Sequence, residues 1–127
     1  MKKLLILLFS ILISLNSYGE WINHSSDTDG NDFYLDYGTI KQNNGYKYAW
    51  EMADYVEPTP YGHLSTKVYK KYDCSLGMDQ ILSFVYYNQS MGKGNPDDTE
   101  NPSNPEWRYP PPGSVGAFTL EEVCKQK

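Results

Sequence analysis

The chain has 127 residues, a mass of 14.6 kDa and a formal net charge of −5. This length accommodates one small domain and excludes large nucleotide-binding or barrel enzymes. Aromatic residues make up 15% of the chain and include twelve tyrosines, so we expect a core built largely from rings. A mean hydropathy of −0.63 argues against a multi-span membrane protein.

The first nineteen residues have the order of a secretory signal peptide. Lys2 and Lys3 precede an apolar run over residues 4–15, which is too short to span a bilayer, and Ser17 and Gly19 supply a small-residue cleavage site. We predict a signal peptide over residues 1–19 and one mature domain over residues 20–127, exported to the periplasm, the cell surface or the medium, with no transmembrane span after cleavage. An uncleaved N-terminal anchor is the alternative. No cysteine follows the apolar run, which excludes a lipid anchor there.

Without Lys2 and Lys3, the mature domain keeps nine basic and 16 acidic residues, a net charge of −7. Such a surface repels phosphate backbones, and no basic stripe compensates for the repulsion. Nucleic-acid binding is therefore not expected, whereas cationic partners are electrostatically favoured.

The clearest local signal is a β-hairpin around Asn44-Gly45, which supplies the positive φ values of a tight turn. Residues 33–42 and 46–55 on either side are rich in aromatic and β-branched residues. In the second arm, Tyr46, Tyr48, Trp50 and Met52 alternate with Lys47, Ala49, Glu51 and Ala53. This period of two, with one polar face, predicts an antiparallel sheet that is covered on one side only.

Further strands are predicted at Trp21–Ile22, at residues 64–74 and at residues 81–89, with a polar loop over residues 23–32. Pro58 and Pro60 end the strand before them because proline cannot donate to a ladder.

The last third of the chain changes in composition. Residues 92–113 hold six of the eight prolines and predict an irregular or polyproline loop, from which Trp107 is expected to pack back on the core. Thr119 to Glu122 match a capping box, so a C-terminal helix is predicted, with an earlier start at Ser114 as the alternative. The predicted fold class is α+β, mainly β: a small antiparallel meander of four to six strands with a C-terminal helix.

The two cysteines, Cys74 and Cys124, both lie in the mature domain. Two cysteines in an exported domain of this size are expected to form one disulfide, which would join the end of a strand to the helix. Two free buried thiols are the alternative. No C-x-x-C supports a redox or zinc motif.

No group of residues predicts catalysis. The segment Asp27–Asp32 has the alternating aspartates of a calcium loop, but the sixth and twelfth positions hold Asp32 and Gly38 instead of Gly and Glu, which favours a solvated turn. His24 and His63 lie beside turn residues, and we predict that both are solvated loop residues. The chain is therefore predicted not to be an enzyme and to need no metal or cofactor.

What remains is a surface that could bind a protein. Tyrosine gives a large contact area at a low entropic cost, and Lys67, Lys70 and Lys71 form a local basic group on an acidic protein. The predicted ligand-binding residues are Lys67, Tyr69, Lys71 and Tyr86. Packing within the sheet is the alternative role of the tyrosines, and solubilising an edge strand is that of the lysines.

Several pieces of the mature chain occur in the order found in one known family. They are Tyr34-Leu35-Asp36 with Thr39-Ile40-Lys41, Tyr48 to Met52 with Asp54-Tyr55, Ser65-Thr66-Lys67 with Tyr72-Asp73-Cys74, Trp107 before Pro112-Gly113-Ser114, and Val123-Cys124. From Trp21 to Cys124 the chain resembles the surface-adhesin protein E family of Gram-negative bacteria. It departs from lipidated members in lacking an anchor cysteine, and its Asn/Pro-rich insert after Met91 is long.

The resemblance implies a small β-sheet, a C-terminal helix and a Cys74–Cys124 bond. It also implies an adhesin-like module that binds host matrix or serum proteins and can form a homodimer. The function predicted from the sequence is thus an exported binding module. The alternatives are a periplasmic inhibitor of a basic enzyme, which the charge of −7 would steer toward its target, and a small hydrolase or metal-dependent enzyme.

Overall fold

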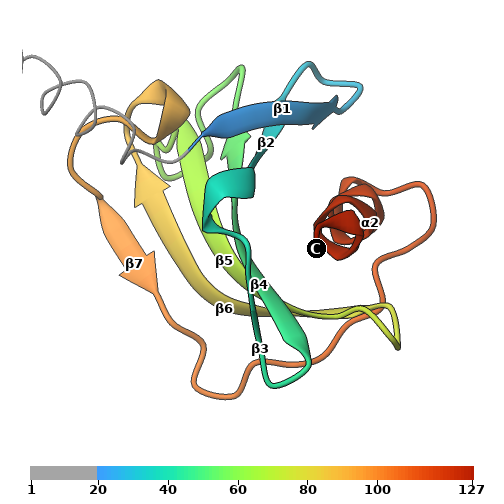
Figure 1. Cartoon of the computed structure of the whole chain (residues 1–127). Coiled ribbons are helices and arrows are strands. Elements are labelled where there is room, and N and C mark those ends of the chain that lie inside the picture. The colour runs from blue at the N-terminus through green and yellow to red at the C-terminus, as the bar shows by residue number, and fades with distance from the viewer. Residues whose placement is uncertain (1–19) are drawn as a thin grey trace, which may run out of the picture.

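The computed structural model describes residues 20–127, and the predicted signal peptide lies outside this range. Its strands are β1 (Trp21–Ser26), β2 (Asp32–Asp36), β3 (Lys41–Asn43), β4 (Tyr46–Asp54), β5 (Ser65–Asp73), β6 (Met78–Tyr87) and β7 (Asp98–Glu100). Two 3₁₀ turns, η1 (Tyr37–Thr39) and η2 (Ser90–Gly92), and one helix, α2 (Val115–Lys125), complete it. The strands form one antiparallel sheet in the order β1-β2-β4-β5-β6-β7, with β3 also paired to β4 (Figure 1). The predicted fold class, α+β and mainly β, is confirmed, with seven strands in the described residues where four to six were predicted.

The predicted hairpin turn at Asn44-Gly45 is present, with φ values of 52° and 83°. Its first arm, predicted as one strand over residues 33–42, is interrupted by η1. Asp36 causes the break, because its carboxylate accepts a hydrogen bond from the Gly38 amide and caps the turn. As a result β2 and β3 pair with successive halves of the same strand, β4.

The larger remaining differences from the predicted strands concern β1, β6 and β7. β1 continues to Ser26, into the predicted polar loop, because its backbone pairs with β2 even where its side chains are polar. β6 starts at Met78 instead of residue 81. β7 lies inside the predicted irregular loop of residues 92–113, where three polar residues pair with the free edge of β6. The sequence did not predict this strand because these residues show no alternation of apolar and polar side chains.

Helix α2 starts at the earlier of the two predicted positions. The Ser114 hydroxyl accepts a hydrogen bond from the Ala117 amide and caps the helix. Thr119, in the predicted capping box, instead lies within the helix and donates to the Val115 carbonyl. Three consecutive prolines, Pro110–Pro112, lie just before Gly113 and Ser114 and prevent the helix from beginning sooner.

The sheet curves around α2, which lies on its concave side (Figure 1). The core lies between them and is small: Leu35, Ala49, Tyr72 and Val123 are fully buried. The prediction that only one side of the sheet is covered was wrong. Met52, which points to the convex side, is only 1% exposed because η2 packs over β4 and β5 there.

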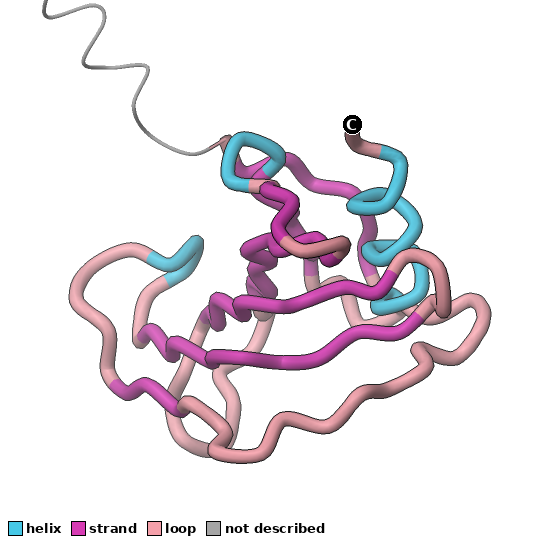
Figure 2. Tube along the Cα trace, turned by 60° about the horizontal axis from the view of Figure 1, so that its bottom comes forward, coloured by secondary structure: helices cyan, strands magenta, loops and turns pink. Residues whose placement is uncertain are grey.

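The segment after β7 runs beside the long strands of the sheet back to α2 (Figure 2). It is attached at Arg108, whose backbone forms two hydrogen bonds with Asp79 of β6. This attachment places Trp107 on the convex side and the three prolines next to the start of α2.

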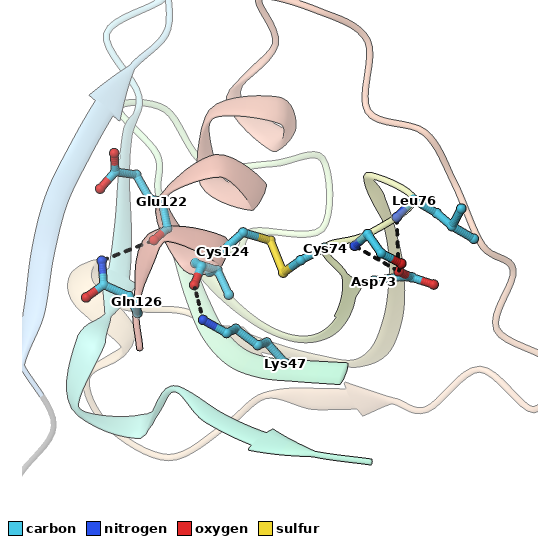
Figure 3. Close-up of a disulfide and its surroundings, with 9 residues drawn as sticks. Lys47, Asp73, Cys74, Leu76, Glu122, Cys124 and Gln126 are labelled. Carbon is cyan, nitrogen blue, oxygen red and sulfur yellow. Dashed lines mark hydrogen bonds between the residues drawn. A yellow bond between two sulfur atoms is a disulfide. The ribbon is translucent and has the colours of Figure 1, made fainter. Parts of the chain in front are cut away.

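The predicted disulfide is confirmed: Cys74 and Cys124 are bonded, with their Cα atoms 5.7 Å apart (Figure 3). It joins the turn after β5 to the last turn of α2. Beside it, Lys47 Nζ of β4 donates to the Val123 carbonyl at 3.4 Å, and the Tyr37 hydroxyl donates to Glu122 at 3.1 Å, so the C-terminal end of the helix is held by covalent and polar contacts.

The double substitution Cys74→Ala/Cys124→Ala should lower the free energy of unfolding by about 4 kcal/mol, because the bond closes a long loop in the unfolded chain. Urea unfolding followed by tryptophan fluorescence measures this change. Chemical reduction of the unsubstituted protein should reproduce it. A midpoint unchanged by either treatment would show that the disulfide does not stabilise the domain.

Candidate binding surfaces

The convex side of the sheet carries a row of aromatic rings with lysines between them. On β4 and β5, the rings of Trp50 and Tyr69 lie 4.9 Å apart and those of Tyr48 and Tyr69 lie 6.1 Å apart. Trp107, from the loop, stacks on Tyr46 at 5.6 Å, so it packs back on the sheet, but on the convex side and not on the core as predicted. We call this group, Tyr46, Tyr48, Trp50, Tyr69, Lys71 and Trp107, the aromatic–lysine surface.

Lys71 lies within the aromatic–lysine surface, with its Nζ 4.2 Å from the ring centre of Tyr46 and 5.6 Å from that of Trp107. Lys67 lies four residues earlier on the same side of β5, with its Nζ 4.9 Å from the ring centre of Tyr87 and 5.7 Å from that of Trp21. A cation held over a ring face is attracted to it without being neutralised. The convex side therefore presents half-buried rings together with positive charge.

The structure brings together three of the four residues predicted to bind a ligand. Lys67, Tyr69 and Lys71 all point to the convex side, whereas Tyr86 points to the concave side. The predicted edge-strand role of the lysines was wrong, because β5 lies between β4 and β6. Lys70, which we grouped with them, also points to the concave side.

Lys70 is the centre of a buried group of charges that the sequence analysis did not predict. Its Nζ lies 2.9 Å from Glu51 and 3.6 Å from Asp79, and Arg108 lies 3.0 Å from Asp79. Asp79 is completely buried, and its Oδ2 has no hydrogen-bond partner among residues 20–127. The alternation along β5 was the signal that could have separated Lys70 from Lys67 and Lys71.

Tyr72 joins this group, because its hydroxyl donates to Glu51 at 2.6 Å. Burial, followed by the Glu51 charge, raises the pKa of Tyr72 well above its usual value. Tyr72 therefore stays protonated and remains a donor to Glu51 throughout the physiological range.

Next to these charges, the concave side contains a mainly apolar cavity of about 430 Å³. Its floor is the sheet, where it is lined by Phe33, Ala53, Val68, Ile81 and Phe84. Its wall is Tyr109, Pro110 and Pro111 with the start of α2. Helix α2 covers only the neighbouring part of the sheet, so these side chains remain partly open.

A second cavity, of about 610 Å³, lies further along the same side. Three tyrosines, Tyr55, Tyr61 and Tyr86, line it together with His63 and three carboxylates, Asp97, Asp98 and Glu100. Burial, and then the nearby Glu100, raise the pKa of Tyr86. The cavity thus combines aromatic faces with negative charge.

Both histidines differ from the prediction of solvated loop residues. His63 is 7% exposed, because it stacks on Tyr86 at 4.9 Å and its Nε2 lies 2.9 Å from Asp97. The hydrogen bond from His63 lowers the pKa of Asp97. His24 lies in β1 and stacks on Phe118 of α2 at 5.6 Å.

Three comparisons place this geometry among known proteins. The family model described as surface-adhesin protein E matches residues 21–125. The chain belongs to the surface-adhesin protein E family.

The fold agrees with solved members of that name. A crystal form II structure of Haemophilus influenzae protein E matches with a TM-score of 0.61 at 16% identity, covering 83% of this chain and 87% of that one. A second structure of Haemophilus influenzae protein E matches with a TM-score of 0.60 at 16% identity, covering 83% of each chain. No curated protein matches the sequence.

The protein E family is a family of surface adhesins and not an enzyme family. Within residues 20–127, no three histidine, cysteine or acidic side chains are grouped as metal ligands, and no helix is long and apolar enough to cross a bilayer. The segment Asp27–Asp32, which resembles a calcium loop in sequence, is a turn in which the Asp27 carboxylate accepts hydrogen bonds from the amides of Asp29 and Asn31. Its carboxylate is therefore occupied by the backbone around it.

Replacing Lys70 by Met should lower the free energy of unfolding by about 3–5 kcal/mol, because Glu51 and Asp79 would lose their buried cation. Lys67→Met, on the convex side of the same strand, is the matched control and should cost about 0.5–1 kcal/mol. Urea unfolding of both variants tests this. Equal losses of unfolding free energy in the two variants would show that Lys70 does not stabilise the buried carboxylates of Glu51 and Asp79.

His24 should make the domain less stable in mild acid. Burial lowers its pKa from the usual 6.5, although Glu51 and Glu122 partly oppose the shift and Lys70 adds to it. The unfolded chain then binds the proton more readily, so stability is complete above 6.5 and falls as the pH drops toward the folded-state pKa.

The melting temperature, measured from pH 7.5 to 5.5, should fall less steeply in His24→Asn than in the unsubstituted protein. Identical slopes would remove His24 as the source of the acid sensitivity.

Proposed function

We propose that the mature domain is an exported, adhesin-like binding module that attaches to extracellular proteins, with the host matrix as the target suggested by the family. The aromatic–lysine surface carries this proposal. Family membership supports a location outside the cytoplasm, and the predicted signal peptide over residues 1–19 supplies the route of export.

The chemistry of the aromatic–lysine surface suits protein recognition. Rings that already stack on one another lose little conformational entropy when a partner covers them. Lys71, held between Tyr46 and Trp107, offers a positive charge in a fixed position to an acidic group on the partner.

A periplasmic inhibitor of a basic enzyme is the second candidate. The observation that favours it is the acidic, tyrosine-lined cavity on the concave side, in a mature domain whose net charge is −7. The two candidates predict different locations and different partners, so one set of experiments separates them.

The first experiment fractionates the producing cells and treats intact cells with protease. Digestion of the protein on intact cells supports the adhesin. Confinement to the periplasm contradicts it and directs the search toward a basic hydrolase whose activity falls when the protein is added.

The second experiment measures binding of the purified domain to immobilised matrix proteins. Lys71→Ala should weaken binding about tenfold if the aromatic–lysine surface forms the contact. Lys127→Ala, which removes the same charge from the chain end, is the matched control and should have no effect. Equal binding by both variants, each with an unchanged melting temperature, would contradict the role of this surface.

A further inference from the structure

The two concave cavities lie next to each other on the same side of the sheet, and we call them together the groove. Three neighbouring strands each contribute one residue to the apolar cavity and, two positions away, one to the acidic cavity. The pairs are Ala53 and Tyr55 at the end of β4, Val68 and Thr66 on β5, and Phe84 and Tyr86 on β6. Residues two apart on one face of a strand are about 7 Å apart, so the two cavities are neighbours along these strands.

The apolar end of the groove contains a polar group that the domain leaves without a full set of partners. Phe84 and Val68 form its floor, and Asp79 and Lys70 lie at its inner end. Asp79 is completely buried, and its Oδ2 has no hydrogen-bond partner within the described chain. The charge partner of this oxygen is Lys70 Nζ, 3.6 Å away, so this end of the groove has a buried ion pair behind its apolar floor.

The acidic end has its charges fixed by strand register. β7 pairs with β6 so that Asp98 lies opposite Tyr86 and Glu100 lies opposite Phe84, and paired residues point to the same side of a sheet. Among residues 20–127, neither Asp98 nor Glu100 takes part in an ion pair. Two exposed carboxylates therefore border a pair of stacked rings whose centres are 6.0 Å apart.

We propose that this groove binds an extended protein segment in which an apolar side chain and a lysine or arginine are separated by one residue. Alternate side chains of an extended segment point the same way about 7 Å apart, which matches the two-residue spacing of Phe84 and Tyr86, one in each cavity. The apolar side chain fills the space over Val68 and Phe84. The basic side chain lies over Tyr86 and between Asp98 and Glu100, where ring faces and carboxylates both attract it.

This site is separate from the aromatic–lysine surface, because it lies on the opposite side of the sheet. The charges also exclude an acidic segment. Asp97, Asp98 and Glu100 border one end of the groove, and the positive charges at the other end are already paired with Glu51 and Asp79.

The test is a titration of the isotope-labelled mature domain with the capped peptide Gly-Phe-Gly-Lys-Gly, followed by amide chemical shifts. Two control peptides replace Phe by Ser or Lys by Gln. The Phe/Lys peptide should shift the amides of Val68, Phe84 and Glu100 and should bind at least about fivefold more tightly than either control. Equal affinities for the three peptides, or shifts confined to the convex side, would overturn the proposal.

Two variants locate the peptide in the groove. Glu100→Gln should weaken binding of the Phe/Lys peptide by about threefold to fivefold and leave the Gln peptide unaffected, since only the charge attraction is lost. Glu121→Gln, an exposed position on α2 that lines neither cavity, is the matched control and should bind normally. An equal loss in both variants would show that only the net charge matters.

Ala53→Leu, which fills the apolar cavity from its floor, should weaken binding of the Phe peptides while the Ser peptide keeps its affinity. Lys71→Ala should bind all three peptides as the unsubstituted domain does. This last result separates the groove from the proposed adhesin surface, because failure of either site leaves the other measurable.

Discussion

The bond between Cys74 and Cys124 determines how α2 covers the sheet. It holds the last turn of an 11-residue helix over one end of β4 and β5. The helix crosses the strands, as its nearly end-on view in Figure 1 shows, and is about 10–12 Å wide, whereas the nine-residue strands beneath it extend about 30 Å. The helix, fixed at one end, leaves the other half of the concave side uncovered. The small core and the open groove both follow from this mismatch.

Charges take the place of apolar packing where the helix does not reach. Lys70, Glu51, Asp79 and Arg108 lie between the core and the apolar cavity, and Arg108 also attaches the proline-rich loop to β6. A buried ion pair adds little net stability, but it tolerates few alternative arrangements of its partners. The charged group thus fixes the position of the loop that forms the outer wall of the groove.

The two sides of the sheet consequently offer opposite chemistry. The convex side exposes lysines between aromatic rings, and the concave side exposes carboxylates beside aromatic rings. An acidic domain with both surfaces can meet partners of either charge. The same strands contribute to both surfaces, because consecutive residues along β5 point to opposite sides of the sheet.

The sequence by itself determined the local features whose causes are local. Asn44-Gly45 makes a hairpin turn because its residues adopt positive φ, and the alternation after Tyr46 makes a strand because side chains point to opposite sides in turn. The disulfide followed from there being two cysteines in an exported domain, and the family resemblance agreed with it. The sequence left the N-cap of α2 open between Ser114 and Thr119, because either hydroxyl can accept a hydrogen bond from the backbone amide three residues further on.

Only the tertiary structure decided which charges are buried and which residues share a surface. Alternation along β5 separates Lys70 from Lys67 and Lys71, but only the pairing with β4 and β6 brings Glu51 and Asp79 to Lys70. His63 is buried because Tyr86 and Asp97, distant in sequence, meet it across the sheet. Tyr86 was grouped with Lys67, Tyr69 and Lys71 by residue type, yet strand register puts it on the other side. Such pairings depend on contacts between distant segments, and the local pattern of residues carries no record of them.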